Sequence, residues 1–319
     1  MRAMHRLPRA MPFQQVRRFH QTRSAPFLNE ALDAASGIVY GVHSASHLPW
    51  ALSIPLTAFL VRMGVAFPLQ IFYKVQARRD TDLAPILQAW RHHYQRQVHQ
   101  ISANESISRA QAMRMVPERG TKKYVELRRR WGVIRHWKGL PWLQIPFWIA
   151  MMESVRAMSG MSQGLVPYLL SLSQGSAETI KLAVEPTLAT EGALWFPDLL
   201  AGDPTGVLPV VLTASILLNV QNGWKVPALK EIADMPRKDM WSKLRWRALR
   251  LGIQILACNL GLSAYMTGMP TALLIYWITS TNIATLQTSF LDKYMFPSPA
   301  VKPRKPVYIG YPRARKEKI

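Results

Sequence analysis

Cysteine is almost absent from this 319-residue chain, which contains only Cys258. A single cysteine excludes a disulfide within the chain and a cysteine-based metal site. The sequence also lacks a phosphate-binding glycine-rich loop, a zinc-protease motif and a catalytic nucleophile arrangement. Four histidines, His92, His93, His99 and His136, follow no usual ligand spacing, and we interpret them as part of a basic helical surface. We therefore expect a protein that is not an enzyme and needs no metal or cofactor.

Acidic residues are also scarce, with 18 against 40 basic residues and a formal net charge of +22. A balance this basic usually indicates nucleic acid or anionic lipid as a partner. The basic residues avoid several long apolar stretches and gather between them. No zinc-finger spacing, RNA-binding aromatic motif or basic zipper is present. We therefore expect membrane lipid, and no nucleic acid, as a partner.

The first 25 residues contain no acid, and the first acidic residue of the chain is Glu30. The segment is rich in arginine and lacks a continuous apolar core, which is typical of a mitochondrial transit peptide. An Arg-Arg-Phe sequence at positions 17–19 resembles a matrix-processing site. We predict a transit peptide over residues 1–24 and an intermembrane-space tether over residues 25–47. The alternative is that the basic segment is a disordered arm.

An apolar stretch from Trp50 to Phe72 is interrupted by one charged residue, Arg62. About 20 mostly apolar residues suffice for a membrane helix. An arginine at that depth costs roughly 2.5–3.5 kcal/mol, and it is tolerated where it faces protein or a water-filled cavity. We therefore predict a polytopic membrane protein with a polar hollow beside Arg62.

We predict an all-α fold with five membrane-spanning helices, because the net charge of the intervening loops alternates in sign. The first loop has a net charge of +10, the second −4 and the third +4, and the tail has +6. The positive-inside rule then places the basic segments and the C-terminus in the matrix, and the N-terminus in the intermembrane space. The predicted segments are 48–72, 140–160, 206–223, 249–267 and 270–290 for the helices, 74–138 for a matrix-side helical hairpin, 48–292 for the core and 293–319 for a basic tail.

The hairpin is expected to contain two helices. The first spans about 75–101, and the second begins near Ser106 or Ser108, whose hydroxyls are suitable N-caps, and ends near Trp131. Pro117 is expected to kink or interrupt the second helix, because proline removes a backbone N–H and clashes with the preceding turn.

Four groups of residues follow one another along residues 46–292 in a specific order. They are Thr57, Arg62 and Pro68-Leu69; Gln144-Ile145-Pro146 with Arg156-Ala157-Met158-Ser159; Leu194-Trp195-Phe196-Pro197-Asp198-Leu199 with Asp203-Pro204 and Leu208-Pro209; and Pro270, Leu273, Tyr276-Trp277, Thr279-Ser280, Asn282 and Gln287. Together these groups resemble the motifs of the YidC/Oxa family of membrane insertases. The resemblance implies that the protein moves polar segments into or across a membrane through a hydrophilic groove, without bond chemistry.

Two further features resemble the mitochondrial branch of that family that exports the C-terminal tail of cytochrome c oxidase subunit 2. The loop before Leu194 is long, and the tail after helix five is short and contains five prolines. Stable ribosome docking is not expected, because the general mitochondrial insertase docks ribosomes with a long helical tail. The resemblance implies newly made inner-membrane proteins, oxidase subunit 2 in particular, as substrates. Whether assembly factors also bind the protein is left open.

Two helix faces are candidates for lining the groove together with Arg62. They consist of Gln144, Trp148, Met151 and Met152 on the second helix and Trp277, Thr281, Thr285 and Thr288 on the fifth. Spacings of three and four residues place each set on one face. Packing or lipid contact explains the methionines equally well, and hydrogen bonding between helices explains the threonines equally well.

Glu153 departs from the family pattern, which has an apolar or small residue there. It lies three residues before Arg156, so the two side chains share a helix face, and we favour a structural ion pair. Arg62 has two interpretations. One is a positive centre in a hydrated groove, and the other is a salt bridge to Glu153 that only joins helices.

A further motif places aromatic side chains beside acids before the third helix. It consists of Trp195, Phe196, Asp198, Asp203 and Pro204. Tryptophan favours the membrane–water interface, so we interpret this segment as an anchor at the outer interface. Direct contact with a substrate is the alternative.

Two other functions are open on the sequence alone. A small-solute transporter is expected to have broken helices in paired positions or internal repeats, and the sequence has neither. A membrane scaffold for respiratory-complex assembly, without insertion activity, would need the same helices and loops.

Overall fold

The computed structural model describes residues 26–104, 109–161, 164, 184–233 and 237–295. Within these residues the regular structure is helical, apart from two isolated bridges that pair Ala193 with Phe196 and Gly202 with Pro270. This confirms the predicted all-α class. The predicted transit peptide, the serines proposed as N-caps in the hairpin and most of the basic tail lie outside the described residues.

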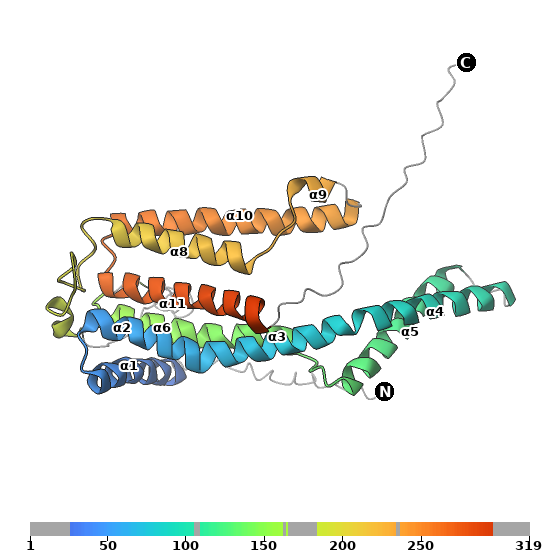
Figure 1. The fold of residues 1–319 in the computed structure, drawn as a ribbon, viewed down its shortest axis with the longest axis horizontal. Helices are drawn as coiled ribbons and strands as arrows, with labels where there is room; N and C mark the ends of the chain where they lie inside the picture. The colour runs from blue at the N-terminus through green and yellow to red at the C-terminus, as the bar shows by residue number, and fades with distance from the viewer. Residues whose placement is uncertain (1–25, 105–108, 162–163, 165–183, 234–236, 296–319) are drawn as a thin grey trace, which may run out of the picture.

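The helices form a bundle from which one pair projects (Figure 1). In chain order they are α1 Pro26–Ser46, α2 Trp50–Val61, α3 Phe67–Asp82, α4 Ala84–Asn104, α5 Arg109–Arg130, α6 Gln144–Met158, α8 Val207–Gly223, α9 Leu229–Ala233, α10 Arg237–Met266 and α11 Thr271–Phe290. Tighter 3-10 turns occupy η2 (Trp137–Leu143) and η3 (Pro186–Ala189), and wider π turns occupy η1 (Arg62–Ala66) and η4 (Leu291–Met295). Helix α11 is central, because it contacts α2, α6 and α8, whereas α10 packs on the outer side of α8.

The main hydrophobic core lies where the central helices meet. It contains Trp50 from α2, Met151 from α6, Leu212 from α8 and Leu274 from α11, each no more than 1% exposed. Side chains from four helices therefore converge on one cluster, and this cluster fixes α6 and α11 relative to α2.

Two described helical stretches are long and apolar enough to cross a membrane, Trp50–Ser102 and Asp239–Met266. Helix α8 is apolar but shorter, and α6 and α11 do not meet the same criteria. Helix α11 contains many serine and threonine residues, which lower its mean hydropathy. The count of five crossings therefore stays a prediction.

The segment predicted to be a tether is a packed helix, α1, which contacts α2 and α6. Its buried residues Leu32, Ala35 and Val39 are spaced by three and four and form one apolar face. Glu30 and Asp33 interrupt the apolar pattern around those residues, so a search for a long apolar run misses this helix.

Polar and aromatic contacts join the end of α1 to α2 and to the loop before α8. The His43 ring stacks on Trp50, with centroids 3.7 Å apart and planes 7° apart. The Tyr40 hydroxyl donates to a Glu185 carboxylate oxygen at 2.9 Å, and burial together with this carboxylate raises the pKa of Tyr40 to about 12. A hydrogen bond from Thr187 holds the pKa of Glu185 below its ordinary value.

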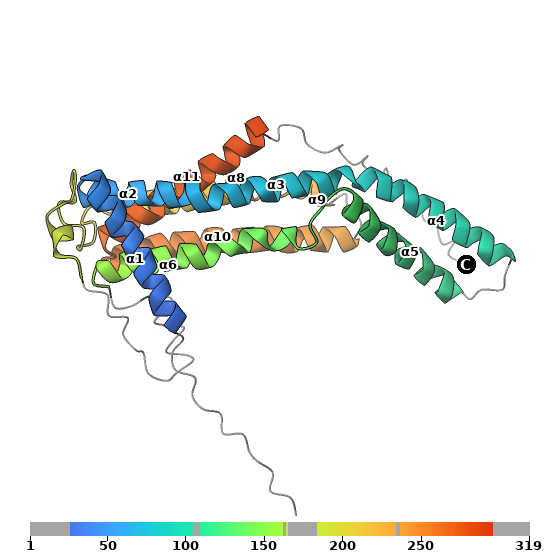
Figure 2. The same cartoon turned by 90° about the horizontal axis from the view of Figure 1, so that it is seen from below.

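Helices α4 and α5 lie side by side and extend away from the bundle (Figures 1 and 2). A single turn residue, Leu83, separates α3 from α4 within the first arm. Of the kink or interruption expected at Pro117, the interruption does not occur, because α5 continues through this residue. Because the helix is exposed on that side, the missing backbone hydrogen bond can be replaced by water.

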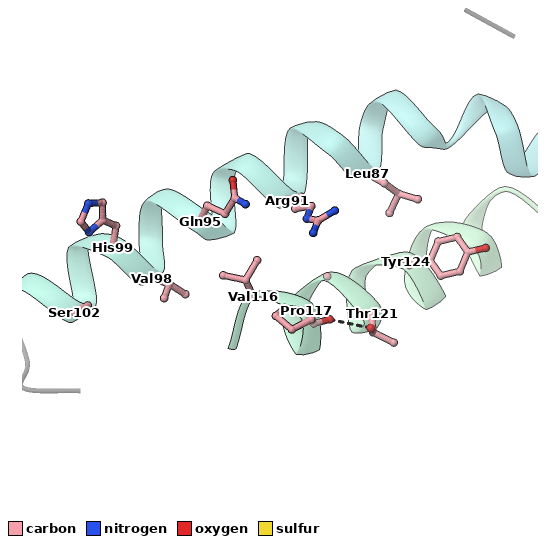
Figure 3. Close-up of a pocket in the computed structure, with 11 residues that line it drawn as sticks. Leu87, Arg91, Gln95, Val98, His99, Ser102, Val116, Pro117, Thr121 and Tyr124 are labelled. Atoms are coloured by element: carbon pink, nitrogen blue, oxygen red, sulfur yellow. Dashed lines mark hydrogen bonds between the residues drawn. The ribbon is translucent and has the colours of Figure 1, made fainter. Parts of the chain in front are cut away.

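A furrow of about 840 Å³ separates the two helices of this arm (Figure 3). Arg91 and Gln95 of α4 and Val116 and Thr121 of α5 line it. A second, smaller core at the base of the arm, around Leu83, joins the arm to the bundle.

Candidate functional site

Arg62 begins a π-helical turn, η1, which joins α2 to α3. Pro68 explains this turn, because in a regular α-helix its ring would clash with the carbonyl group of Gly64 four residues earlier. A π turn adds a residue to the helical repeat and relieves the clash. Turns of this kind are frequent at functional sites. Pro68 was the signal for this turn in the sequence, although we predicted a plain helix there.

Two side chains of α11 hold Arg62 in place. Its Nε donates to the Ser280 hydroxyl at 2.9 Å, and its backbone carbonyl accepts from the Gln287 side-chain amide at 3.1 Å. Ser280 and Gln287 are 1% and 5% exposed and lie seven residues apart, which places both on one face of α11. The π turn and α11 therefore share a polar contact inside an apolar bundle.

A cavity of about 20 Å³ lies beside Arg62 and is also lined by Gln144 and Trp148 of α6 and Tyr276 of α11. This is room for about one water molecule. The structure thus brings Arg62, Gln144 and Trp148 together as predicted groove residues, but the space between them does not admit a polypeptide. Passage of a chain at this point requires the surrounding helices to move apart.

The positive charge of Arg62 has no acidic neighbour in this cavity. None of the described residues that line the cavity is acidic, and the ion pairs between described residues do not join Arg62 to Glu153. Hydrogen bonds within the described part of the chain use only Nε of its guanidinium group. Both Nη groups therefore keep their capacity to bind water or an anion.

The Trp148 and Trp277 rings connect α6 to α11 next to the cavity. They stack with planes 16° apart and centroids 6.5 Å apart. The Trp277 indole N–H and the Gln144 side-chain oxygen are buried and have no hydrogen-bond partner among the described residues. The boundary between α6 and α11 therefore contains two buried polar groups that make no hydrogen bond to the described residues.

Met151 and Met152 do not line the cavity. They are 0% and 6% exposed and belong to the hydrophobic core. Helix α1 covers this end of α6, and the packing interpretation of the two methionines is therefore the one that this structure supports.

The three threonines of α11 that were predicted to line the groove contact helix backbone and α8, and no hydrogen bond between described residues joins them to Arg62. The Thr285 hydroxyl accepts from the Asn219 amide at 2.9 Å and donates to the Thr281 carbonyl at 3.0 Å. The Thr288 hydroxyl donates to the carbonyl of Ala284 at 2.9 Å. From the sequence we assigned Ser280 and Gln287 only to the family motif, although their seven-residue spacing marked the face that meets Arg62.

Glu153 and Arg156 form a buried ion pair on α6, with side-chain exposures of 0% and 5%. Arg156 also donates to the carbonyl of Met161 just beyond the helix. A buried ion pair needs further hydrogen bonds to offset its desolvation, and this second contact supplies one.

The two acids of the interfacial motif accept hydrogen bonds from backbone N–H groups, Asp203 at the start of α8 and Asp198 in the loop before it. Asp203 accepts from the Leu208 N–H at 2.7 Å and from the Thr205 hydroxyl at 2.7 Å. Burial alone raises the pKa of Asp203, but these hydrogen bonds outweigh it and hold the pKa below its ordinary value. Asp198 accepts from the Leu200 N–H at 2.8 Å. Pro204 follows Asp203 and cannot donate, so the first bonds of the cap come from Thr205 onward.

The aromatic half of the same motif forms a turn between residues 193 and 196. Phe196 is buried, whereas Trp195 is 41% exposed and Leu194, with φ +55°, is 84% exposed. An exposed apolar tip next to an aromatic ring suits contact with a membrane surface.

Comparison with known proteins places the chain beside mitochondrial membrane proteins. It is 26% identical to the human cytochrome c oxidase assembly protein COX18 over 259 residues, which is 81% of this chain and 69% of that protein. It is 25% identical to the Schizosaccharomyces pombe assembly protein cox18 over 255 residues, covering 80% of this chain and 97% of that protein. The bovine mitochondrial inner membrane protein OXA1L is 29% identical over 126 residues, or 39% of this chain and 25% of that protein. No protein-family model and no solved structure matches the chain.

Proposed function

We propose that this chain is a mitochondrial member of the YidC/Oxa family of membrane insertases, and that it inserts newly made proteins into the mitochondrial inner membrane during cytochrome c oxidase assembly. Several relatives that match about four fifths of the chain are named as assembly proteins for this oxidase. The proposed cargo is oxidase subunit 2, whose C-terminal tail has to reach the intermembrane space.

One observation carries the mechanism: a half-buried arginine whose cavity has no acid among its described lining residues. A polar or acidic segment that reaches Arg62 gains a cationic partner, which lowers the cost of taking unsatisfied polar groups through hydrocarbon. The membrane potential draws each negative charge toward the intermembrane space, by about 2.3 kcal/mol per 100 mV. Five crossings, with the N-terminus outside and the C-terminus in the matrix, are part of this proposal.

Entry of the segment opens the bundle between α6 and α11. The Trp148–Trp277 stack closes this boundary, and the cavity behind it has room for about one water molecule. The rings therefore separate when a polypeptide enters. Gln144 and the Trp277 indole then supply hydrogen bonds to the polar segment, since neither group has a partner among the described residues.

The test is export of the subunit 2 tail in mitochondria that contain Arg62→Ala as their only copy of this protein. We expect the amount of tail accessible to protease from the intermembrane space to fall about tenfold, equivalent to roughly 1.4 kcal/mol. Arg62→Lys keeps the charge and should retain most of the export. Arg78→Ala is the matched control, because Arg78 is an exposed arginine of α3. Normal export by a well-accumulated Arg62→Ala protein would contradict the mechanism.

Two rival functions give different results in this assay. A scaffold without insertion activity should lose partner proteins and not tail export when Arg62 is replaced. A solute transporter should leave the subunit 2 tail unaffected and change the flux of a small molecule instead.

A further inference from the structure

A second pocket, of about 440 Å³, lies between α10 and the chain around α9, apart from the Arg62 site (Figure 1 shows the two helices). One part of its lining is apolar and includes Leu229, Leu244 and Leu251. The other part contains two arginines, Arg247 and Arg250. The pocket is therefore amphipathic, with two cationic groups beside an aliphatic surface.

The two arginines are held in the pocket by the helix and by one backbone contact. Residues three apart lie on the same helix face, so Arg247 and Arg250 point the same way. One Nη of Arg247 donates to the Pro227 carbonyl at 3.2 Å, which ties its side chain to the opposite wall. Both arginines are half-buried, whereas Lys243 and Arg245 on the same helix are exposed and do not line the pocket.

The pocket lies where α10 changes from basic to apolar. Arg250 is the last charged residue of this helix, and the part that follows runs to Met266 without a charge within a candidate membrane span. Trp246, which is 52% exposed, lies against Trp224 with ring centroids 5.5 Å apart. Tryptophans gather at the membrane–water interface. In the topology proposed above, the arginines lie at headgroup level on the matrix side.

We propose that this pocket binds an anionic phospholipid, with its phosphate between Arg247 and Arg250 and the start of an acyl chain against Leu229 and Leu251. A soluble anion would match the guanidinium groups but not the aliphatic wall, and a neutral lipid would match the wall but not the charge. Basic pockets beside membrane helices on the matrix side are suited to such headgroups. The proposal does not depend on substrate insertion through the Arg62 site.

The experiment measures lipid retained by the purified full-length protein in native mass spectrometry, with tetraoleoyl cardiolipin or dioleoyl phosphatidylcholine as the added lipid. The Arg247→Gln/Arg250→Gln protein should retain roughly thirtyfold less cardiolipin than the unaltered protein, because it lacks both cationic groups that face the phosphate. Phosphatidylcholine retention should not change. Lys243→Gln/Arg245→Gln removes the same charge from the same helix outside the pocket and should keep most of the cardiolipin.

A second variant tests the apolar wall without changing the charge. Ala248 lines the pocket, so Ala248→Trp should fill it and lower cardiolipin retention several-fold while both arginines remain. Equal losses in the two double variants would overturn the proposal, because they would show attraction to overall charge only. Undiminished retention in Ala248→Trp would also contradict it, and this variant decides the question if the arginine variant does not fold.

Discussion

The helix bundle around Arg62 and the α4–α5 arm use charge in opposite ways. In the bundle, Glu153 and Arg156 are enclosed and form an ion pair with each other. In the arm, Lys122 and Glu118 form an exposed ion pair at 3.1 Å, with side-chain exposures of 77% and 66%. Breaking a buried pair leaves an uncompensated charge, whereas an exposed pair contributes little. The same kind of substitution should therefore have very different effects in the two regions.

The largest effect is expected from a chemical link between α6 and α11. Trp148→Cys/Trp277→Cys, made with Cys258→Ser, places two thiols across the boundary that is proposed to open. A short bis-maleimide should then abolish export of the subunit 2 tail. The matched link in the arm, Arg91→Cys/Thr121→Cys across the furrow in Figure 3, should leave export nearly unchanged. Equal inhibition by the two links would remove the distinction between bundle and arm.

The next largest effect is on stability. Arg156→Gln leaves Glu153 buried without its cationic partner, and we expect a loss of about 3–5 kcal/mol in the free energy of unfolding. The protein should accumulate poorly in mitochondria, and its thermal midpoint in lipid nanodiscs should fall. Arg129→Gln, at an exposed position of α5, is the control and should be neutral within about 0.5 kcal/mol. A stable Arg156→Gln protein would show that the buried pair is dispensable.

A smaller effect is expected at the cap of α8. Asp203→Asn weakens three hydrogen bonds to Thr205 and Leu208 and should cost about 1–2 kcal/mol. The folded-state pKa of Asp203 lies below its unfolded value, so its contribution is complete above about pH 4 and is lost as the pH falls further. Thermal midpoints measured between pH 3 and pH 7 should converge for the two proteins at the acid end. A constant difference across that range would contradict the assigned role.

The smallest effect is expected at the exposed pair of the arm. Glu118→Gln removes a contact that is largely solvated, and we expect a change of less than about 0.5 kcal/mol. A thermal midpoint that shifts by as much as in Asp203→Asn would mean that the arm depends on its surface charges more than exposure indicates.

Helices that follow a proline or a glycine could be predicted from the sequence, and packed amphipathic or interrupted segments could not. The predicted segments 206–223 and 270–290 lie within a residue of α8 and α11 as helices, because a proline or glycine precedes each apolar run. Helix α1 was not predicted. Its apolar face is narrow and is interrupted by acids in the sequence, and it is buried only because α1 packs on α2 and α6. Helix α10 begins before the predicted 249, in a basic stretch without an apolar signal.

The sequence predicted the central residue of the candidate site, Arg62, but it did not predict which residues contact it. Arg62 stood out because a single charge in an apolar stretch needs a polar environment. Its partners Ser280 and Gln287 are more than 200 residues away in the sequence, and only the packing of α11 against the π turn brings them together. Helical spacing placed Met151 on the same face as Gln144, but it could not foresee that α1 would cover that end of α6.

The most direct test of the proposed route is contact between Gln144 and a polypeptide in transit. A photoreactive amino acid at Gln144, which lines the Arg62 cavity, should crosslink to newly made subunit 2 during export. The same probe at Leu256, which is 66% exposed on α10, should give little or no such product. Crosslinks from Leu256 but not from Gln144, or from neither position while export proceeds, would contradict a route past Arg62.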